Sequence, residues 1–121
     1  MRLLLVEDEE RISAFLSKGL RARGYAVDWA PTGTKALERL TVPDPPYDVV
    51  VLDLGLPDID GLEVLRRIRA RGNAVPVIIV TARSGEEHLA RSRELGADDY
   101  LVKPFPFRDF LASLERSGAA V

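Results

Sequence analysis

Short aliphatic runs alternate along this chain with longer segments whose apolar residues have helical spacing. The strongest runs cover residues 3–6, 49–52 and 77–80, and weaker runs cover residues 26–30 and 100–102. The strong runs consist of valine, isoleucine and leucine alone. Strands that are apolar on both faces are typical of a parallel sheet with helices on each side. The runs therefore predict five parallel strands.

The segments between and after these runs predict helices. Ile12, Phe15, Leu16 and Leu20 recur at the spacing that places side chains on one face of a helix. Shorter versions of this pattern lie within residues 36–40, 62–68, 89–95 and 107–114. Alternating strands and helices favour an α/β fold in which right-handed crossovers join the strands. We therefore predict a single doubly wound (βα)5 domain with a five-stranded parallel sheet.

The length of the chain, 121 residues, suits one domain rather than two. A domain of this size buries roughly two-thirds of its unfolded surface, which is enough for a core without cross-links. We predict that residues 1–117 form the domain and that residues 118–121 are a frayed tail or the start of a linker. The proline-rich residues 43–46 predict a stiff loop inside the domain.

Composition excludes several classes of function. The chain has no cysteine, which excludes disulfide scaffolds, cysteine zinc sites and thiol catalysis, and suits a reducing compartment. The 17 basic and 19 acidic residues give a net charge of −2, which argues against direct contact with nucleic acid. No apolar run reaches the roughly 18 residues of a membrane helix, and Glu7 follows Met1 too soon for a signal peptide. We expect a soluble, cytoplasmic protein without membrane contact.

Polar residues follow the predicted strands where a ligand would bind. In an open α/β sheet, ligands bind beyond the carboxyl ends of the strands, where the strand order reverses. Glu7 and Asp8 follow the first strand and Asp53 follows the third. Three carboxylates in one pocket repel each other unless a cation joins them, and oxygen ligands suit Mg²⁺ or Mn²⁺. The sequence therefore predicts a divalent metal site.

Thr81 ends the fourth strand and Lys103 follows the fifth, so both residues belong to the same edge of the sheet. A metal ion, an ammonium and a hydroxyl around one carboxylate suit a phosphoryl group, with Asp53 as the nucleophile that becomes an aspartyl phosphate. The alternative is that the acidic run after the first strand only caps the next helix. Asp53 resists that interpretation, because an aspartate directly after a buried apolar strand needs partners.

Short motifs surround these strand ends. They are Val6-Glu7-Asp8, Asp53-Leu54-Gly55-Leu56-Pro57 followed by Asp60-Gly61, Val80-Thr81-Ala82, Gly96-Ala97-Asp98-Asp99-Tyr100 and Lys103-Pro104-Phe105. At these spacings the set resembles the receiver domain of two-component response regulators, over nearly the whole chain, and is most similar to the OmpR/PhoB branch. The resemblance implies a flavodoxin-like fold with strand order 2-1-3-4-5.

The resemblance also implies a role for each site residue. Asp53 would be the phosphoacceptor, and Glu7, Asp8, Asp53 and the backbone carbonyl of Gly55 would hold Mg²⁺. Lys103 would pair with a phosphate oxygen and Thr81 would donate its hydroxyl to the phosphoryl group. Tyr100 would be a switch that turns inward when Thr81 moves, and the peptide bond before Pro104 would be cis.

The partners that the resemblance implies are a sensor histidine kinase and, after phosphorylation, a second copy of the chain. The copies would meet through the face formed by the fourth helix, the fifth strand and the fifth helix, and a DNA-binding domain outside these residues would control transcription. Ser113 stands where relatives often carry an arginine that pairs across this face. The chain is therefore not expected to form that one inter-subunit ion pair.

Three other functions remain as alternatives. A phosphatase of the haloacid-dehalogenase type needs Asp-x-Asp, but Gly55 occupies the second aspartate position. A flavodoxin-like flavin carrier needs a Ser/Thr-rich phosphate loop, which the acidic run after the first strand replaces. A receiver that binds partners without phosphorylation is the third. The leading prediction is a signalling module that promotes only its own phosphorylation and turns over no separate substrate.

Three further features are interpreted as structural. His88 is expected at the surface of the weak fourth helix, and Trp29 is expected to pack on the second strand. The arginines within residues 66–71 are expected to form a solvated helix end that complements the helix dipole.

Overall fold

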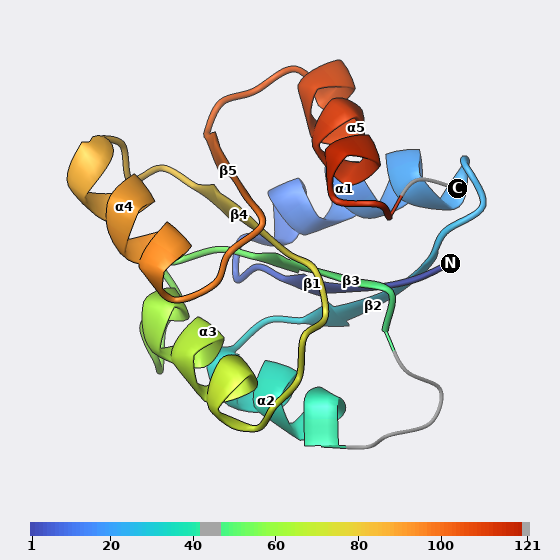
Figure 1. Ribbon diagram of the computed structural model, residues 1–121. Coiled ribbons are helices and arrows are strands. Elements are labelled where there is room, and N and C mark those ends of the chain that lie inside the picture. The colour runs from blue at the N-terminus through green and yellow to red at the C-terminus, as the bar shows by residue number, and fades with distance from the viewer. Residues whose placement is uncertain (42–46, 120–121) are drawn as a thin grey trace.

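The computed structural model describes residues 1–41 and 47–119, in which strands and helices alternate (Figure 1). The strands are β1 (Arg2–Val6), β2 (Ala26–Ala30), β3 (Val49–Leu52), β4 (Val77–Thr81) and β5 (Asp99–Val102). The helices are α1 (Glu10–Arg21), α2 (Gly33–Thr41), α3 (Gly61–Ala70), α4 (Glu86–Glu94) and α5 (Phe107–Arg116). Each predicted strand and helix is present. None of the described helices combines the length and the apolar character that a membrane crossing needs.

The strands form one sheet in the order β2-β1-β3-β4-β5, and all neighbouring pairs are parallel. The predicted fold class and strand order are therefore confirmed. Helices α1 and α5 cover one face of the sheet, and α2, α3 and α4 lie on the other (Figure 1). Because side chains alternate along a strand, Leu3 and Leu5 pack on the α1/α5 face and Leu4 and Val6 pack on the other face.

The register of the sheet brings the functional strand ends together. Val6 pairs with Leu52, so the residues that follow β1 and β3 leave the sheet side by side. Thr81 pairs with Val102, so the end of β4 lies beside the start of the segment after β5. The strand order reverses between β1 and β3, which is where an open α/β sheet has its binding crevice.

The end of the described chain packs against the domain. Ala119 is buried, and its carbonyl accepts a hydrogen bond of 2.7 Å from the hydroxyl of Tyr25. Ala119 thus packs against the domain, whereas Gly118 is exposed. The predicted boundary at residue 117 and the predicted tail stay predictions. The predicted stiff loop at residues 43–46, and residues 120–121 of the predicted tail, lie outside the described residues.

Candidate functional site

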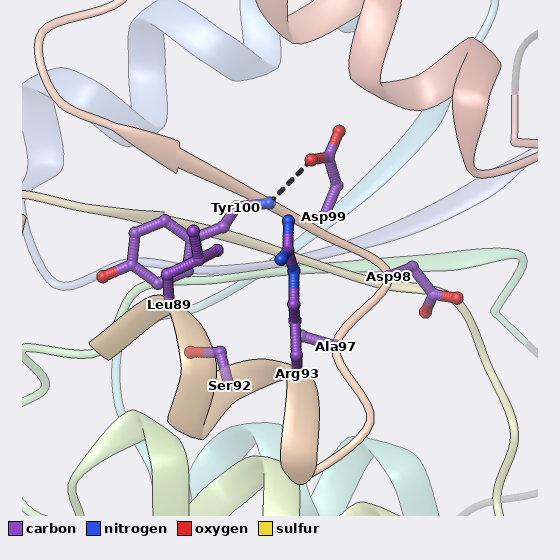
Figure 2. Close-up of a pocket in the computed structure, with 7 residues that line it drawn as sticks. All are labelled: Leu89, Ser92, Arg93, Ala97, Asp98, Asp99 and Tyr100. Carbon is purple, nitrogen blue, oxygen red and sulfur yellow. Dashed lines mark hydrogen bonds between the residues drawn. The ribbon is translucent and has the colours of Figure 1, made fainter. Parts of the chain in front are cut away.

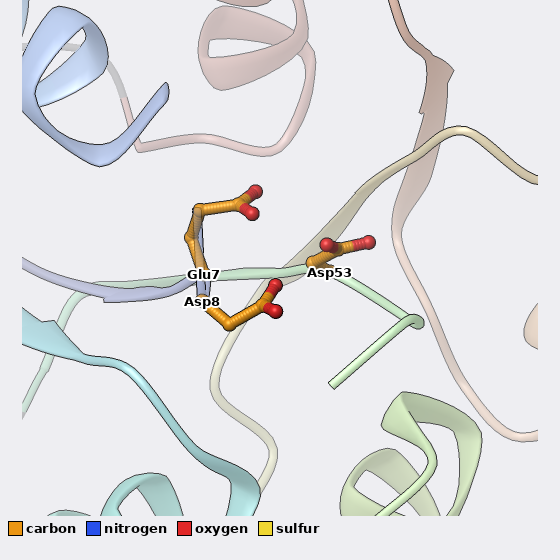
Figure 3. Close-up of side chains that lie close together, drawn as sticks. All are labelled: Glu7, Asp8 and Asp53. Carbon is orange, nitrogen blue, oxygen red and sulfur yellow. The ribbon is translucent and has the colours of Figure 1, made fainter. Parts of the chain in front are cut away.

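Three carboxylates gather at the carboxyl edge of the sheet (Figure 3). Glu7 directly follows β1, Asp8 comes next, and Asp53 directly follows β3. Each offers a ligand oxygen, and these oxygens all lie within 4.8 Å of one another. Glu7 is fully buried and Asp53 is 5 % exposed, whereas Asp8 is exposed to solvent. The structure thus brings together the three side chains predicted as metal ligands.

Lys103 brings a positive charge into contact with this cluster. Its Nζ lies 2.7 Å from Glu7 Oε2 and 3.3 Å from Asp53 Oδ2. Burial lowers the pKa of Lys103, but the hydrogen bond to Glu7 and the charge of Asp53 outweigh that effect and raise it above its usual value. The ammonium therefore stays charged beside the two buried carboxylates.

One ammonium does not compensate three carboxylates. Burial raises the pKa of Glu7 to about 7, although the hydrogen bond from Lys103 lowers it, and the charge of Asp53 raises it further. Such an excess of negative charge among oxygen donors fits a hard divalent cation. The chemistry of this donor set therefore suits Mg²⁺.

The loop after β3 packs tightly against Asp53. The N–H of Gly55 donates to Asp53 Oδ1 at 3.2 Å, and Gly55 itself is exposed. Gly61, at the start of α3, lies against the backbone carbonyl of Asp53 and the Cα of Leu54, so that a Cβ at position 61 would overlap both. The role of the Gly55 carbonyl as a metal ligand stays a prediction.

Thr81 and Lys103 are joined through the backbone. The N–H of Lys103 donates to the carbonyl of Thr81 at 2.8 Å, and the peptide bond between Lys103 and Pro104 is cis. Thr81 is 1 % exposed, and its Oγ accepts the N–H of Arg83 at 3.2 Å. Because this contact uses a lone pair of Oγ, the hydroxyl proton remains available for donation.

Tyr100 lies on β5 beside α4. Figure 2 shows its ring next to Leu89 in a small pocket. The pocket is lined by Leu89, Ser92, Arg93, Ala97, Asp98, Asp99 and Tyr100. The ring is partly buried, and its hydroxyl donates to the carbonyl of Arg83 at 2.7 Å. Tyr100 is thus attached to the loop that follows Thr81.

Asp99, which precedes Tyr100 on β5, is bonded to two side chains of α5. Ser113 is buried, and its Oγ donates to Asp99 Oδ2 at 2.6 Å, while Arg116 Nη2 lies 2.7 Å from the same oxygen. Burial raises the pKa of Asp99, but the hydrogen bonds from Ser113 and Arg116 outweigh that effect and lower it. Asp99 is therefore compensated within its own chain.

Two contacts near the site were not predicted from the sequence. Arg83 Nη2 lies 2.8 Å from Asp60 Oδ2, and the Nε1–H of Trp29 donates to the carbonyl of Glu7 at 2.6 Å. Trp29 thus fixes the backbone at the end of β1 and does not only pack on β2. No sequence signal pointed to either contact, because each depends on where a long side chain points. His88 is partly buried and belongs to no potential metal cluster of residues 1–41 and 47–119.

A family model for the response regulator receiver domain matches residues 3–115. The chain belongs to this family, whose members are signalling modules and not enzymes that turn over a separate substrate. Membership removes the phosphatase and flavodoxin alternatives.

Similar proteins include transcriptional regulators of bacteria. The chain is 43 % identical to the transcriptional regulatory protein CusR of Escherichia coli K12, over 100 % of this chain and 54 % of CusR. It is 46 % identical to QseB of Haemophilus influenzae, over 95 % of this chain and 51 % of QseB. The chain thus spans about half the length of these relatives, which are OmpR/PhoB-type regulators, as the resemblance implied.

Solved receiver domains have the same fold. The non-phosphorylated HemR receiver domain of Leptospira biflexa is 38 % identical with a TM-score of 0.88, over 99 % of this chain and 95 % of that one. TrrA of Thermotoga maritima, solved in complex with Mg²⁺ and beryllofluoride, is 34 % identical with a TM-score of 0.84, over 96 % and 97 %.

Proposed function

We propose that this domain accepts a phosphoryl group on Asp53 and that the phosphorylated state is read on the face formed by α4, β5 and α5. The observation that carries the proposal is the position of Asp53. It lies at the reversal point of the sheet, within 3.3 Å of the Lys103 ammonium and in one cluster with Glu7 and Asp8. The donor is a phosphohistidine of a sensor kinase or a small acyl phosphate.

The chain's own residues carry the transfer. A carboxylate oxygen of Asp53 forms a bond to phosphorus while the bond from phosphorus to the donor nitrogen or oxygen breaks, and that atom leaves with the electron pair. Lys103, already beside Asp53, pairs with a phosphoryl oxygen. Thr81 donates its free hydroxyl proton to another oxygen. Glu7, Asp8, Asp53 and the Gly55 carbonyl would hold Mg²⁺, or Mn²⁺, which when bound neutralises negative charge on the phosphoryl oxygens.

The signal reaches the surface through Thr81 and Tyr100. A phosphoryl group on Asp53 adds charge and acceptor oxygens that favour one position of the Thr81 hydroxyl. Arg83, two residues later, is bonded to Tyr100 through its carbonyl. A change in the position of Thr81 therefore alters the hydrogen bond that holds Tyr100 of β5 beside α4. Packed surfaces convert small shifts of this kind into discrete states.

The proposed partners follow from the relatives. Receiver domains of transcriptional regulators pair with histidine kinases. We further propose that the phosphorylated domain dimerises through α4, β5 and α5, in the cytoplasm, and that a DNA-binding domain outside these residues acts on transcription. The receiver domain itself is proposed to contact neither DNA nor membrane.

The test of phosphorylation is intact mass after incubation with acetyl phosphate, with Mg²⁺ or with a chelator. We expect a gain of one phosphoryl group that needs Mg²⁺ and is lost in Asp53→Asn. The matched control is Asp109→Asn, which removes an exposed aspartate at the start of α5. A mass gain that persists in Asp53→Asn would show that Asp53 is not the phosphoacceptor. Light scattering with beryllofluoride tests dimerisation, and an unchanged mass contradicts it.

A further inference from the structure

Two loops flank Asp53, and the side chain of Arg83 connects them. Residues 53–60 join β3 to α3, and residues 82–85 join β4 to α4. From the second loop, Arg83 Nη2 lies 2.8 Å from Asp60 Oδ2 and donates to the carbonyl of Leu54 at 3.3 Å. Leu54 is the residue directly after Asp53. The guanidinium therefore fastens one loop to the other next to the phosphoacceptor.

The backbone of Arg83 contacts both residues of the proposed switch. Its N–H donates to Thr81 Oγ at 3.2 Å, and its carbonyl accepts the Tyr100 hydroxyl at 2.7 Å. Arg83 thus links the Thr81 hydroxyl, which would donate to the phosphoryl group, with Tyr100, the proposed aromatic switch.

Asp60 is a fixed anchor for this contact. Its Oδ1 caps α3 by accepting the N–H of Leu62 at 2.9 Å, which leaves Oδ2 for Arg83. Gly61, the next residue, is in close contact with the carbonyl of Asp53. The position of Asp60 is therefore set by the same packing that positions the phosphoacceptor.

We propose that Arg83 is a positioning residue, whose ion pair with Asp60 holds the β4–α4 loop in the conformation that presents the Thr81 hydroxyl to a phosphoryl group and keeps Tyr100 bonded. This inference rests on the proposed function of Asp53 and adds to it the residue that couples the pocket to the switch. The ion pair stabilises the conformation in which it forms, so its loss lowers the population that is ready to bind.

The expected effect is modest because both partners are partly exposed. The side chains of Arg83 and Asp60 are 31 % and 47 % exposed, and exposed ion pairs contribute little. We expect a two- to fivefold loss of affinity for beryllofluoride in the presence of Mg²⁺, on the order of what such pairs contribute.

The experiment uses Asp60→Asn, Arg83→Gln and the double variant. Asparagine keeps a cap oxygen for α3 and removes only the charge. Arg39→Gln is the matched control, because Arg39 is a half-exposed arginine that pairs with Asp28 on the far edge strand β2. The affinity for beryllofluoride is measured by titration.

Fluorine NMR supplies a readout that needs no metal. The chain has three tyrosines, so protein labelled with 3-fluorotyrosine gives three resonances, and Tyr100→Phe identifies that of Tyr100. In the metal-free protein, Asp60→Asn and Arg83→Gln are expected to shift the Tyr100 resonance and to leave that of Tyr25 in place. Arg39→Gln is expected to leave the Tyr100 resonance unchanged.

The double variant decides between coupling and separate effects. If the ion pair acts as a unit, the double variant loses no more affinity than either single variant. Additive losses, or a Tyr100 resonance that stays in place in Asp60→Asn, would overturn the inference. If the wild-type domain binds no beryllofluoride, the proposed function of Asp53 fails, and the metal-free spectra alone still decide whether Arg83 couples Asp60 to Tyr100.

Discussion

Lys103 makes its shorter ion-pair contact with Glu7, at 2.7 Å, and its longer one with the proposed phosphoacceptor Asp53, at 3.3 Å. Glu7 has no exposed surface, and Lys103 is its main charge partner in the described part of the chain. Lys103 thus stabilises the buried carboxylates of the unphosphorylated domain.

This pairing predicts that Lys103→Met destabilises the domain as well as impairing phosphorylation. Without Lys103, the buried Glu7 carboxylate either stays charged without a partner or takes up a proton, and the loss of the pair costs up to about 3 kcal/mol. The urea midpoint of unfolding should therefore fall. The added substitution Glu7→Gln removes the orphaned charge and should recover part of the loss. Equal midpoints for the single and double variants would contradict this account.

A second prediction concerns the contact between Gly61 and Asp53. A Cβ at position 61 would overlap the carbonyl of Asp53 and would lie 2.5 Å from the Cα of Leu54, so the backbone has to move. Gly61→Ala should cost about 1–3 kcal/mol of folding stability, as overpacking does. It should also slow phosphorylation, because Asp53 moves with the loop.

Gly55→Ala is the control for stability in that experiment. A Cβ at position 55 meets no atom within 4 Å, and its φ is not positive. Its unfolding midpoint should stay close to that of the wild type. Equal losses from the two substitutions would show that the close contact at Gly61 is not the cause.

Much of the site could be predicted because it depends on the sheet. Apolar runs fix which residues are strands, and parallel register places the residues after them at one edge. Glu7, Asp53, Thr81 and Lys103 are therefore neighbours in space although they are far apart in sequence. That argument needs only the pattern of apolar residues and the direction of the strands.

The contacts between loops could not be predicted, because they depend on where long side chains point. Arg69 illustrates this, since the arginine run was interpreted as a solvated helix end. The structure shows its guanidinium donating to the carbonyls of Val75 and Gly96, at 2.7 and 2.8 Å. Charge and helical spacing do not distinguish such a contact from a solvated arginine.

A third prediction uses Asp58, which caps α2 from a distant loop. Its carboxylate accepts the N–H groups of Gly33 and Thr34, both at 2.9 Å, and the Thr34 hydroxyl at 2.6 Å. Desolvation raises the pKa of Asp58, but these hydrogen bonds outweigh it and hold the pKa well below its usual range. Asp58→Ala should therefore cost about 1 kcal/mol at pH 7, as the loss of a helix cap does.

The pH dependence of that cost follows from the lowered pKa. A carboxylate with a lowered pKa in the folded state stabilises fully above its unfolded value of about 3.9. This contribution is lost as the pH falls toward the folded pKa. The gap in unfolding free energy between wild type and Asp58→Ala should be constant from pH 7 to 5 and should shrink below about pH 4. Urea unfolding across this range is the measurement, and a gap that does not change would contradict the role of the charge.

The last prediction concerns Asp99 on the proposed dimer face. Ser113 and Arg116 compensate Asp99 within its own chain, so its charge is not available for a partner subunit. Asp99→Asn should thus lower folding stability by about 1.5 kcal/mol, the lower end of the range for a hydrogen bond to a charged group, because the Asp99 side chain is partly exposed. Dimerisation of the beryllofluoride-bound domain should change by less than about twofold, because the charge that is removed crosses no interface.

Sedimentation equilibrium of wild type and Asp99→Asn measures the second effect, and urea unfolding measures the first. Ser113→Ala is the companion variant, since it removes one of the two internal partners and leaves the carboxylate in place. It should lose stability without weakening the dimer. A tenfold loss of dimerisation in Asp99→Asn would mean that Asp99 leaves Arg116 and pairs across the interface in the activated state, and the internal network would then belong to the resting state alone.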